Sequence, residues 1–504
     1  MDDLPQIVNN PTLQWKSAPH FFVEDVWRFP QAQYRNYYRP IFLLWLLVNF
    51  KLFGLHPSLW HLAAIALHGV VVVMVFRLGL RLMGNELAAA AAALLFAVHP
   101  THVESVVWLS GITEPLVAVF FLGAFLQYLN WRETNRVRPM LLCALLTLLA
   151  LLAKETAAAL PLLIMLYEWL FPRVETEKLG VRVTATAHAV WPVFGATAVY
   201  ACMRLFAMNH VVLAQNSPVK VLMTWPLLLW KYVGMTLWPT GLALLYDLRM
   251  VNGPSATRFW LPVAFLIGCA AIFGFALFRN KLVAFLACWW LLPLVPALVG
   301  LLTFPDGDII HDRYTYLPSV AFVLLLGLGL SRLPRSGLEA FRLPLEPFVL
   351  LVVLVGGWGV LTALQTQVWS SGLTLFGHSV AVAPNNLRAR NLLANQFFKA
   401  GDTRRALMLY DSTLRLDPNA WETNFSIGVT LASVGQLQQG ESFLRRACVL
   451  DRKNPESYLV LADVLCAESH RDDARGVLRE GLSAVDMHSE LLQRKLTEIE
   501  TAGK

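Results

Sequence analysis

Residues 141–170 read LLCALLTLLALLAKETAAALPLLIMLYEWL, an apolar stretch interrupted mainly by Lys154-Glu155. A helix needs roughly 20 apolar residues to cross a bilayer. The pattern predicts two membrane segments, 139–153 and 155–171, that meet at a charged junction. A charge inside a membrane is costly, and it marks a candidate functional site by default.

The composition of the whole chain also indicates a membrane protein. Of the 504 residues, 56% are hydrophobic and 15% are charged, whereas a soluble globular chain carries about 25% charged residues. This argues against an ordinary cytosolic enzyme and against disorder. The net charge of +7 requires no nucleic-acid partner, because cytoplasmic loops of membrane proteins collect Lys and Arg. The six cysteines form no CxxC pair, so neither a disulfide framework nor a zinc site is predicted.

Ten segments are candidate spans. They are 58–80, 84–99, 105–130, 139–153, 155–171, 187–207, 259–278, 281–301, 314–331 and 346–365. Basic residues gather on alternate connections, which places those connections in the cytoplasm. The alternation holds only if the apolar stretches 40–55 and 221–238 do not cross. Lys51 and Lys231 inside them favour an interfacial or re-entrant position. Both ends of the chain are then extracytoplasmic.

After residue 366 the pattern changes, and no run is long enough to span a bilayer. Residues 387–488 repeat with a period of 34. The aligned small and large apolar residues are Leu393, Ile427 and Leu461; Ala394, Gly428 and Ala462; and Phe397, Leu431 and Leu465. Gly401, Gly435 and Ser469 fall at one turn. This period and pattern are typical of tetratricopeptide (TPR) repeats, which are helix–turn–helix units.

The predicted fold class is therefore all-α, with a polytopic helical membrane domain followed by a TPR superhelix. The predicted domains are a membrane domain at 1–365 with its first outer loop at 1–57, a linker and half repeat at 366–386, three TPR repeats at 387–488, and a capping helix and tail at 489–504. A TPR array offers a concave face to a peptide or protein.

Three polar clusters lie on the predicted outer side. His99, His102 and Glu104 could bind a metal or a phosphate or donate protons, or this segment could simply cap two helices. Lys154 could pair with Glu155 or hold an anionic group.

The third cluster is His311-Asp312-Arg313, followed by Tyr314 and Tyr316, at the start of a span. A planar guanidinium beside a helix N-terminus suits a phosphate. Interfacial anchoring would explain the tyrosines but not the charged run.

Two further positions belong to the first outer loop. Arg39 follows Tyr37-Tyr38 and could contact a headgroup or only anchor the chain. Asp2 and Asp3 are adjacent carboxylates that could act as a base, or they could form only a solvated chain end. Together these residues suit chemistry on a lipid-linked anionic substrate.

The set of stretches resembles the transmembrane-and-TPR O-mannosyltransferase family and its bacterial relatives, within the GT-C glycosyltransferase superfamily. The resemblance is carried, in the family's order, by DDLPQIVNNPTL (2–13), YYRPIFLLWLLVNFKLFGLHPSLWHLAAIALH (37–68), FAVHPTHVESVVWLSG (96–111), LLAKETAAALPLLIMLYEWL (151–170), LWPTGLALLYD (237–247), HDRYTYLPS (311–319) and the TPR tail.

The resemblance implies a polyprenyl-phosphate sugar donor, commonly mannose, and a protein hydroxyl as acceptor. It implies an acidic base in the first outer loop, and the matching positions are Asp2 and Asp3. The residues that would surround the donor are Arg39, His99, His102, Glu104, Lys154, Glu155, His311, Asp312, Arg313 and Tyr316. Arg313 and Lys154 would stabilise the departing phosphate. No metal ligand is assigned, and a requirement for a divalent cation is left open.

The expected location is a bacterial inner membrane, with the TPR domain extracytoplasmic and a protein or peptide in its groove. Relatives usually carry a transmembrane helix before the acidic pair, so a first helix upstream of Met1 is left open. They often carry an Arg-Lys-Asp-like run where this chain reads Gly-Ile-Thr-Glu (111–114). A catalytically inactive membrane-anchored TPR scaffold is the alternative function, and a lipid or polysaccharide transporter or polymerase is a third.

Overall fold

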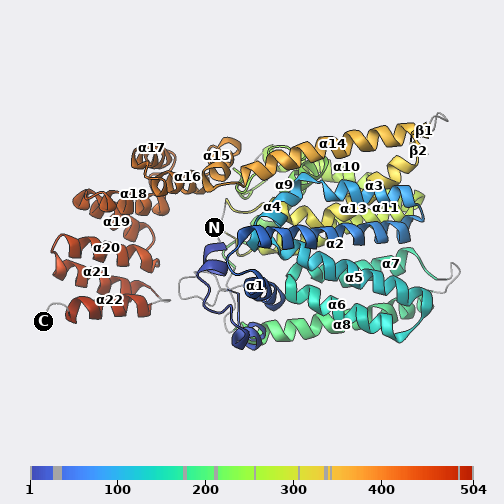
Figure 1. Ribbon diagram of the computed structural model, residues 1–504, viewed down its shortest axis with the longest axis horizontal. Coiled ribbons are helices and arrows are strands. Elements are labelled where there is room, and N and C mark those ends of the chain that lie inside the picture. The colour runs from blue at the N-terminus through green and yellow to red at the C-terminus, as the bar shows by residue number, and fades with distance from the viewer. Residues whose placement is uncertain are drawn as a thin grey trace. The chain divides into compact units, whose positions relative to one another are not determined.

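A computed structural model gives the structure of the chain. It describes residues 3–26, 37–173, 179–208, 214–254, 257–304, 307–333, 339–340, 343–485 and 489–501. These residues are mainly helical, with one antiparallel pair of two-residue strands, β1 (Glu339–Ala340) and β2 (Leu343–Pro344). The chain divides into two compact units (Figure 1). The membrane unit ends at Trp369, and the repeat unit contains residues from Ser370 onward together with Ala243–Asp247.

The membrane unit is built from α-helices joined by short 3₁₀ or π turns (η). Its first half contains η1 (Leu4–Val8), η2 (Trp15–Phe22), α1 (Pro40–Phe53), α2 (Pro57–Met83), α3 (Glu86–Ala97), η3 (Pro100–His102), α4 (Val103–Val107), η4 (Leu109–Gly111), α5 (Thr113–Thr134), α6 (Val137–Ala153), η5 (Glu155–Ala158) and α7 (Ala159–Leu170). Its second half contains α8 (Leu179–Ala207), α9 (Pro218–Leu237), α10 (Thr257–Arg279), α11 (Lys281–Leu291), η6 (Leu292–Leu294), α12 (Val295–Gly300), η7 (Asp312–Thr315), α13 (Tyr316–Ser331) and α14 (Leu345–Val368).

Seven helical stretches among the described residues are long and apolar enough to cross a membrane. The bent pair 86–97 and 100–107, a broken span or a re-entrant loop, brings the number to eight if it crosses. The chain is therefore an integral membrane protein. The remaining two predicted spans contain α6 and α7, which are shorter, with 17 and 12 residues. Neither α1 nor α9, in the two stretches predicted not to cross, is among the seven.

Loops that the charge pattern assigns to one side of the membrane lie at one end of the helices. Arg81 at the end of α2 contacts Glu133 at the end of α5. Arg173, after α7, donates to Asn135 Oδ1 at 2.6 Å. The charged residues predicted on the other side meet one another at the opposite helix ends, as the next section describes.

Close packing of small residues fixes the centre of the membrane unit. A Cβ on Gly327 of α13 would lie 2.3 Å from the carbonyl oxygen of Ala88 and 3.3 Å from the Cβ of Ala92, both on α3. Only glycine allows this approach. Between α5 and α11, Phe125 and Trp289 pack edge to face with ring centroids 5.0 Å apart.

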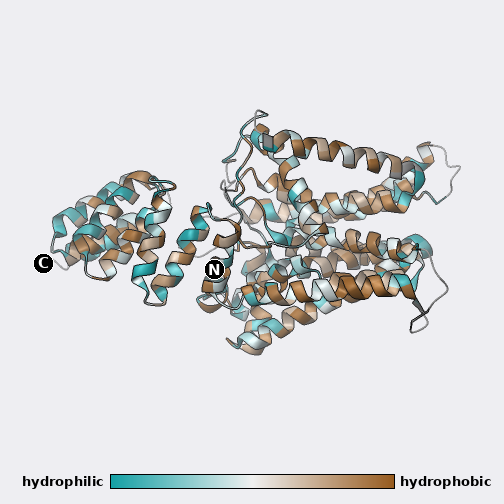
Figure 2. Ribbon diagram, turned by 90° about the horizontal axis from the view of Figure 1, so that it is seen from above, coloured by the Kyte–Doolittle hydropathy of each residue, from teal (hydrophilic) through white to brown (hydrophobic). Residues whose placement is uncertain are grey.

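The repeat unit contains α15 (Gly372–Val382), α16 (Leu387–Lys399), α17 (Thr403–Leu414), α18 (Trp421–Ser433), α19 (Leu437–Leu450), α20 (Pro455–Ala467), α21 (Arg471–Ala484) and α22 (Ser489–Thr501). Figure 2 shows the difference in hydropathy: the membrane helices are mostly hydrophobic, whereas the repeat helices alternate with hydrophilic positions. The predicted all-α class, a membrane domain followed by repeated helix pairs, is confirmed.

The turn inside each helix pair explains the sequence period. Gly401, Gly435 and Ser469 all have positive φ, at 84°, 82° and 69°, a conformation that glycine adopts most readily. These are the three positions that the 34-residue period aligned. A Cβ on Gly428 would lie 2.6 Å from Leu444 Cγ, so the small position of the repeat is needed for close helix contact.

Candidate functional site

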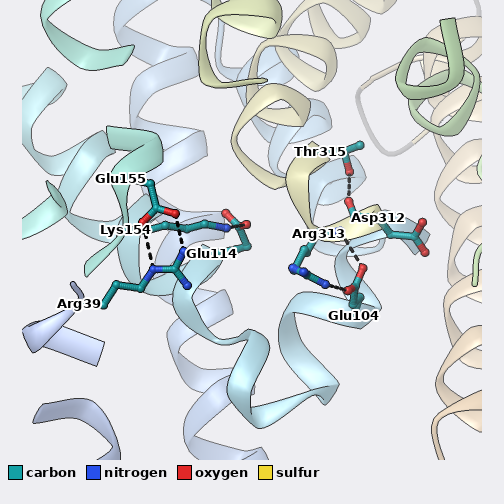
Figure 3. A network of polar contacts seen from close by, with 8 residues as sticks. All are labelled: Arg39, Glu104, Glu114, Lys154, Glu155, Asp312, Arg313 and Thr315. Carbon is teal, nitrogen blue, oxygen red and sulfur yellow. Dashed lines mark hydrogen bonds and ion pairs between the residues drawn. The ribbon is translucent and has the colours of Figure 1, made fainter. Parts of the chain in front are cut away.

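Three interruptions between helices place the charged residues (Figure 3). α3 ends at Ala97, and His99 is extended before Pro100, which cannot donate a backbone hydrogen bond. Lys154 is extended between α6 and η5, with φ −162° and ψ 141°. The third interruption is η7, the 3₁₀ turn that precedes α13. The second and third breaks carry Lys154, Glu155 and Arg313, whereas Glu104 and Glu114 lie in the first turns of α4 and α5.

Neighbouring residues Lys154 and Glu155 have different partners. Arg39 donates two hydrogen bonds to Glu155, Nε to Oε2 at 3.0 Å and Nη2 to Oε1 at 2.5 Å. Lys154 Nζ donates to Oε1 of Glu114 in the first turn of α5. The Lys154 and Glu114 side chains are only 3% and 2% exposed, so this pair lies almost wholly inside the protein.

The third ion pair joins η7 to α4. The backbone N–H of Arg313 donates to Glu104 Oε2 at 2.9 Å, and the Arg313 guanidinium donates to Glu104 Oε1. Glu104 is therefore held by both the main chain and the side chain of one residue. Charge-assisted bonds of this kind are stronger than neutral ones and fix geometry.

Each cation of the cluster also lies against an aromatic ring. Arg39 is 4.4 Å from the centroid of Tyr37, and Lys154 is 4.9 Å from that of Tyr314. Arg313 is 5.1 Å from both Tyr314 and Trp108. A cation over an aromatic face is attracted by the ring quadrupole. Carboxylate and ring together hold each cation in one orientation.

The charges of Lys154 and Glu155, which lie outside helices α6 and α7, depend on their surroundings. Burial by itself would raise the pKa of Glu155, but Arg39 and Lys154 stabilise the carboxylate and bring its pKa to about 2. Burial lowers the pKa of Lys154, and Glu114 opposes that effect.

Asp3 is held by Ser110. Its Oδ1 accepts hydrogen bonds from the Ser110 backbone N–H at 2.9 Å and from the Ser110 hydroxyl at 2.5 Å. The neighbouring Gly111 allows η4 to pack here, because a Cβ at this position would lie 2.9 Å from the carbonyl oxygen of Glu104. Asp2, the other predicted base, lies outside the described residues.

His99 and His102 use both ring nitrogens inside the protein. His99 Nε2 lies 3.2 Å from the Thr236 carbonyl oxygen, and its Nδ1 lies 2.8 Å from Thr101 Oγ1. His102 Nδ1 lies 2.9 Å from the Phe96 carbonyl oxygen, and its Nε2 lies 2.8 Å from Ser319 Oγ. A ligand at either ring would have to displace a protein hydrogen bond.

The other predicted residues surround the break before α13. His311 Nε2 is 3.6 Å from Asp308 Oδ1. The carbonyl oxygen of Asp312 accepts a hydrogen bond from Thr315 Oγ1 at 2.8 Å. The Tyr316 hydroxyl lies 2.6 Å from His68 Nδ1. Among the residues that the structure describes, no group of three His, Cys, Asp or Glu side chains is placed to hold a metal ion.

Comparison with known proteins identifies relatives of the chain, although no family model matches it. Protein O-mannosyl-transferase TMTC3 of Mus musculus is 25% identical over 482 residues, covering 88% of this chain and 51% of the mouse protein. Protein O-mannosyl-transferase TMTC1 of Homo sapiens is 26% identical, covering 83% and 52%. Protein O-mannosyl-transferase F38B6.6 of Caenorhabditis elegans is 25% identical, covering 83% and 60%.

The chain is similar to protein O-mannosyl-transferases. It spans about half the length of the curated relatives it matches. Among solved structures, the crystal structure of yeast Tom70 aligns with a TM-score of 0.23 and 12% identity, covering 86% of this chain and 95% of that chain; so low a score supports no conclusion. The resemblance to O-mannosyl-transferases predicted from the sequence is confirmed.

In this O-mannosyl-transferase-like chain, the cluster joins five of the predicted residues from distant segments: Arg39, Glu104, Lys154, Glu155 and Arg313. Sequence reasoning did not assign their partners, which are Tyr37, Trp108, Glu114 and Tyr314, nor Ser110, which holds Asp3. Glu114 carried a usable signal, because it is a carboxylate inside a predicted span. The aromatic partners carried none, since tyrosine and tryptophan at a membrane boundary are equally expected as anchors.

Proposed function

We propose that the chain is a GT-C type glycosyltransferase that moves a sugar, most simply mannose, from a polyprenyl-phosphate donor to a protein hydroxyl. The single observation that carries the proposal is the similarity to protein O-mannosyl-transferases across 88% of the chain. The charged cluster supports it, because fixed cations beside membrane helices suit a lipid-linked phosphate. The reaction is placed on the extracytoplasmic side of a bacterial inner membrane.

Asp3 is the proposed catalytic base. Its carboxylate takes the proton of a Ser or Thr hydroxyl while the hydroxyl oxygen attacks the anomeric carbon. The bond from that carbon to the phosphate oxygen breaks, and the oxygen keeps the electron pair. The anomeric configuration is inverted, and the products are the glycosylated protein, polyprenyl phosphate and a protonated Asp3. The bonds from Ser110 aim the carboxylate.

Arg313 and Lys154 are the proposed stabilisers of the departing phosphate, and Arg39 adds further N–H donors to the same cluster. Each is already fixed by a glutamate and an aromatic ring. Cations that need no reorganisation when charge develops stabilise a transition state more than mobile ones. We assign Glu104 and Glu155 the role of holding these cations, in place of a direct contact to the donor. The proposed role of His311, Asp312 and Tyr316 is to shape the chain break before α13.

The TPR helices are the proposed binding surface for the acceptor or for a partner protein, with the repeats proposed to be extracytoplasmic. Stacked helix pairs present a concave face that suits an extended peptide. Membrane lipid surrounds the apolar helices, and no nucleic-acid partner is proposed.

A catalytically inactive membrane-anchored TPR scaffold is the second candidate. One observation favours it: each of the three cations of the cluster is already paired with a carboxylate. A scaffold would need these pairs only for stability. The two candidates therefore differ in whether Asp3 affects sugar transfer, and not in the fold.

The test is transfer of radiolabelled mannose from polyprenyl-phosphate mannose to membrane proteins. Vesicles without the chain, with the chain, with Asp3→Asn and with Asp472→Asn are compared. Asp472 is the matched control because it is 93% exposed on α21. Label that requires the chain, falls at least 100-fold with Asp3→Asn and is unchanged with Asp472→Asn supports the proposal. Label that is equal with Asp3→Asn excludes Asp3 as base, and no label with the chain favours the scaffold.

A further inference from the structure

Two tryptophans at helix ends form an aromatic pair beside the charged cluster. Trp108 follows the last residue of α4, and Trp369 follows the last residue of α14. Their rings are nearly parallel, with an interplanar angle of 28° and centroids 6.4 Å apart. Both side chains are half-buried, so part of each ring can be reached from outside.

The polar atoms of this pair are unsatisfied. The indole Nε1 of Trp108 and that of Trp369 are buried, and neither has a hydrogen-bond partner within the described part of the chain. An indole N–H is a donor only, and leaving a buried donor unpaired costs free energy of folding. Buried tryptophan N–H groups usually find an acceptor. Two unpaired indole N–H groups in one aromatic pair indicate that an acceptor from outside the chain belongs there.

A third unsatisfied atom belongs to Ser105 in α4, three residues before Trp108. Ser105 is fully buried, and its hydroxyl has no partner among the described residues. The hydroxyl can donate or accept, whereas the two indoles can only donate.

The pair lies next to the proposed reaction centre. The Arg313 guanidinium lies 5.1 Å from the Trp108 centroid. A Cβ on Gly111 would lie 3.1 Å from Trp108 Cε3, so Gly111 leaves the space that the indole fills. Two residues after Trp108, Ser110 holds the Asp3 carboxylate. Trp108 is thus close to Arg313, a proposed phosphate contact, and close in sequence to Ser110, which holds the proposed base.

We infer that Trp108 and Trp369 form a sugar-binding platform that takes the hexose of the donor, with Ser105 as a third polar contact. A pyranose has an apolar C–H face that packs on an aromatic ring and hydroxyl oxygens that accept from indole N–H groups. It therefore supplies the acceptors that the two indole N–H groups lack. Binding turns the indoles so that their N–H groups meet the hydroxyls. The inference rests on the proposed function for the identity of the donor, and it adds the residues that recognise its sugar.

The test compares two lipids that differ only in the sugar. Equilibrium binding of radiolabelled polyprenyl-phosphate mannose and of radiolabelled polyprenyl phosphate is measured with the purified full chain in detergent. The unchanged chain should bind the mannosylated lipid more tightly. Trp108→Phe and Trp369→Phe keep a ring and remove the N–H, and each should weaken binding of the mannosylated lipid about fivefold, the effect of one hydrogen bond. Affinity for polyprenyl phosphate should not change.

Trp289→Phe is the matched control. Trp289 also has a buried Nε1 without a partner in the described residues, but it lies between α5 and α11. This variant should bind both lipids as the unchanged chain does. Thermal unfolding without lipid separates a ligand contact from a structural one, because removing an unpaired donor should not lower stability. If Trp108→Phe unfolds at a lower temperature than the unchanged chain while Trp289→Phe does not, Trp108 Nε1 is a structural contact and the inference is overturned.

Two further outcomes separate this inference from the proposed function. Mannose transfer with unchanged lipid affinities in both tryptophan variants would overturn the sugar platform and leave the glycosyltransferase intact. Weaker binding of the mannosylated lipid in both variants, with no transfer by the unchanged chain, would support the platform and overturn the transfer reaction. Equal affinity of the unchanged chain for the two lipids would overturn the platform whichever function holds.

Discussion

Removing the charge of Glu114 should strongly destabilise the membrane unit. Glu114 is 2% exposed, and its partner Lys154 is 3% exposed. Breaking a buried ion pair by removing one partner costs about 3–5 kcal/mol, because the other charge stays buried and alone. Arg81 and Glu133 form a matched exposed pair, with side chains 35% and 61% exposed. Exposed pairs contribute about 0–1 kcal/mol, so Glu133→Gln should have little effect.

The measurement is thermal unfolding of the full chain in detergent, followed by loss of the monodisperse folded protein. Glu114→Gln should unfold at a clearly lower temperature than Glu133→Gln, which should match the unchanged chain. A double variant, Glu114→Leu with Lys154→Met, removes both charges and should lose less stability than either single change. Equal unfolding temperatures for Glu114→Gln and Glu133→Gln would refute the claim that the Lys154 pair is a buried structural pair.

Three further predictions test packing, charge and the base. Gly327→Ala should prevent recovery of folded protein, because its Cβ meets the Ala88 carbonyl oxygen at 2.3 Å, whereas Gly329→Ala meets nothing within 4 Å and should express normally. The pKa of Glu155 is about 2 against an ordinary 4.5, so its carboxylate stabilises the folded chain fully above pH 4.5. The difference in unfolding temperature between the unchanged chain and Glu155→Gln should therefore disappear as the pH falls toward 2. Ser110→Ala should slow mannose transfer about tenfold without changing the unfolding temperature, because one bond to the proposed base is lost.

Much of the fold follows from rules that act locally along the chain. Apolar runs and the alternation of basic loops predicted which segments are helical and which loops meet at one end. The 34-residue period predicted the turns at Gly401, Gly435 and Ser469, and all three have the left-handed backbone that a tight turn requires. The segment predicted at 139–153 agrees with α6 to within two residues, whereas α7 begins only at Ala159, because the 3₁₀ turn η5 takes the first four residues of the segment predicted at 155–171.

The pairing inside the site could not be predicted in the same way. Lys154 and Glu155 are adjacent and oppositely charged, yet their partners are 40 and 116 residues away. Glu104 and Arg313, which pair with each other, are 209 residues apart. Local spacing decides which charges lie at a helix break, but helix packing decides which of them meet. A single sequence contains the first kind of information and almost none of the second.

The existing ion pairs do not prevent the cluster from holding a phosphate. Glu104 engages the backbone N–H and the Nη1 atom of Arg313, and a guanidinium carries five N–H donors. Lys154 gives one hydrogen bond to Glu114, and an ammonium carries three donors. Neither glutamate therefore uses all the hydrogen-bond donors of its cation. The formal charges of the three pairs cancel, so a phosphate would gain affinity from oriented donors and not from net positive charge. Arg313→Lys keeps the charge but loses the planar fork, and it should weaken polyprenyl phosphate binding if oriented donors are what the cluster provides.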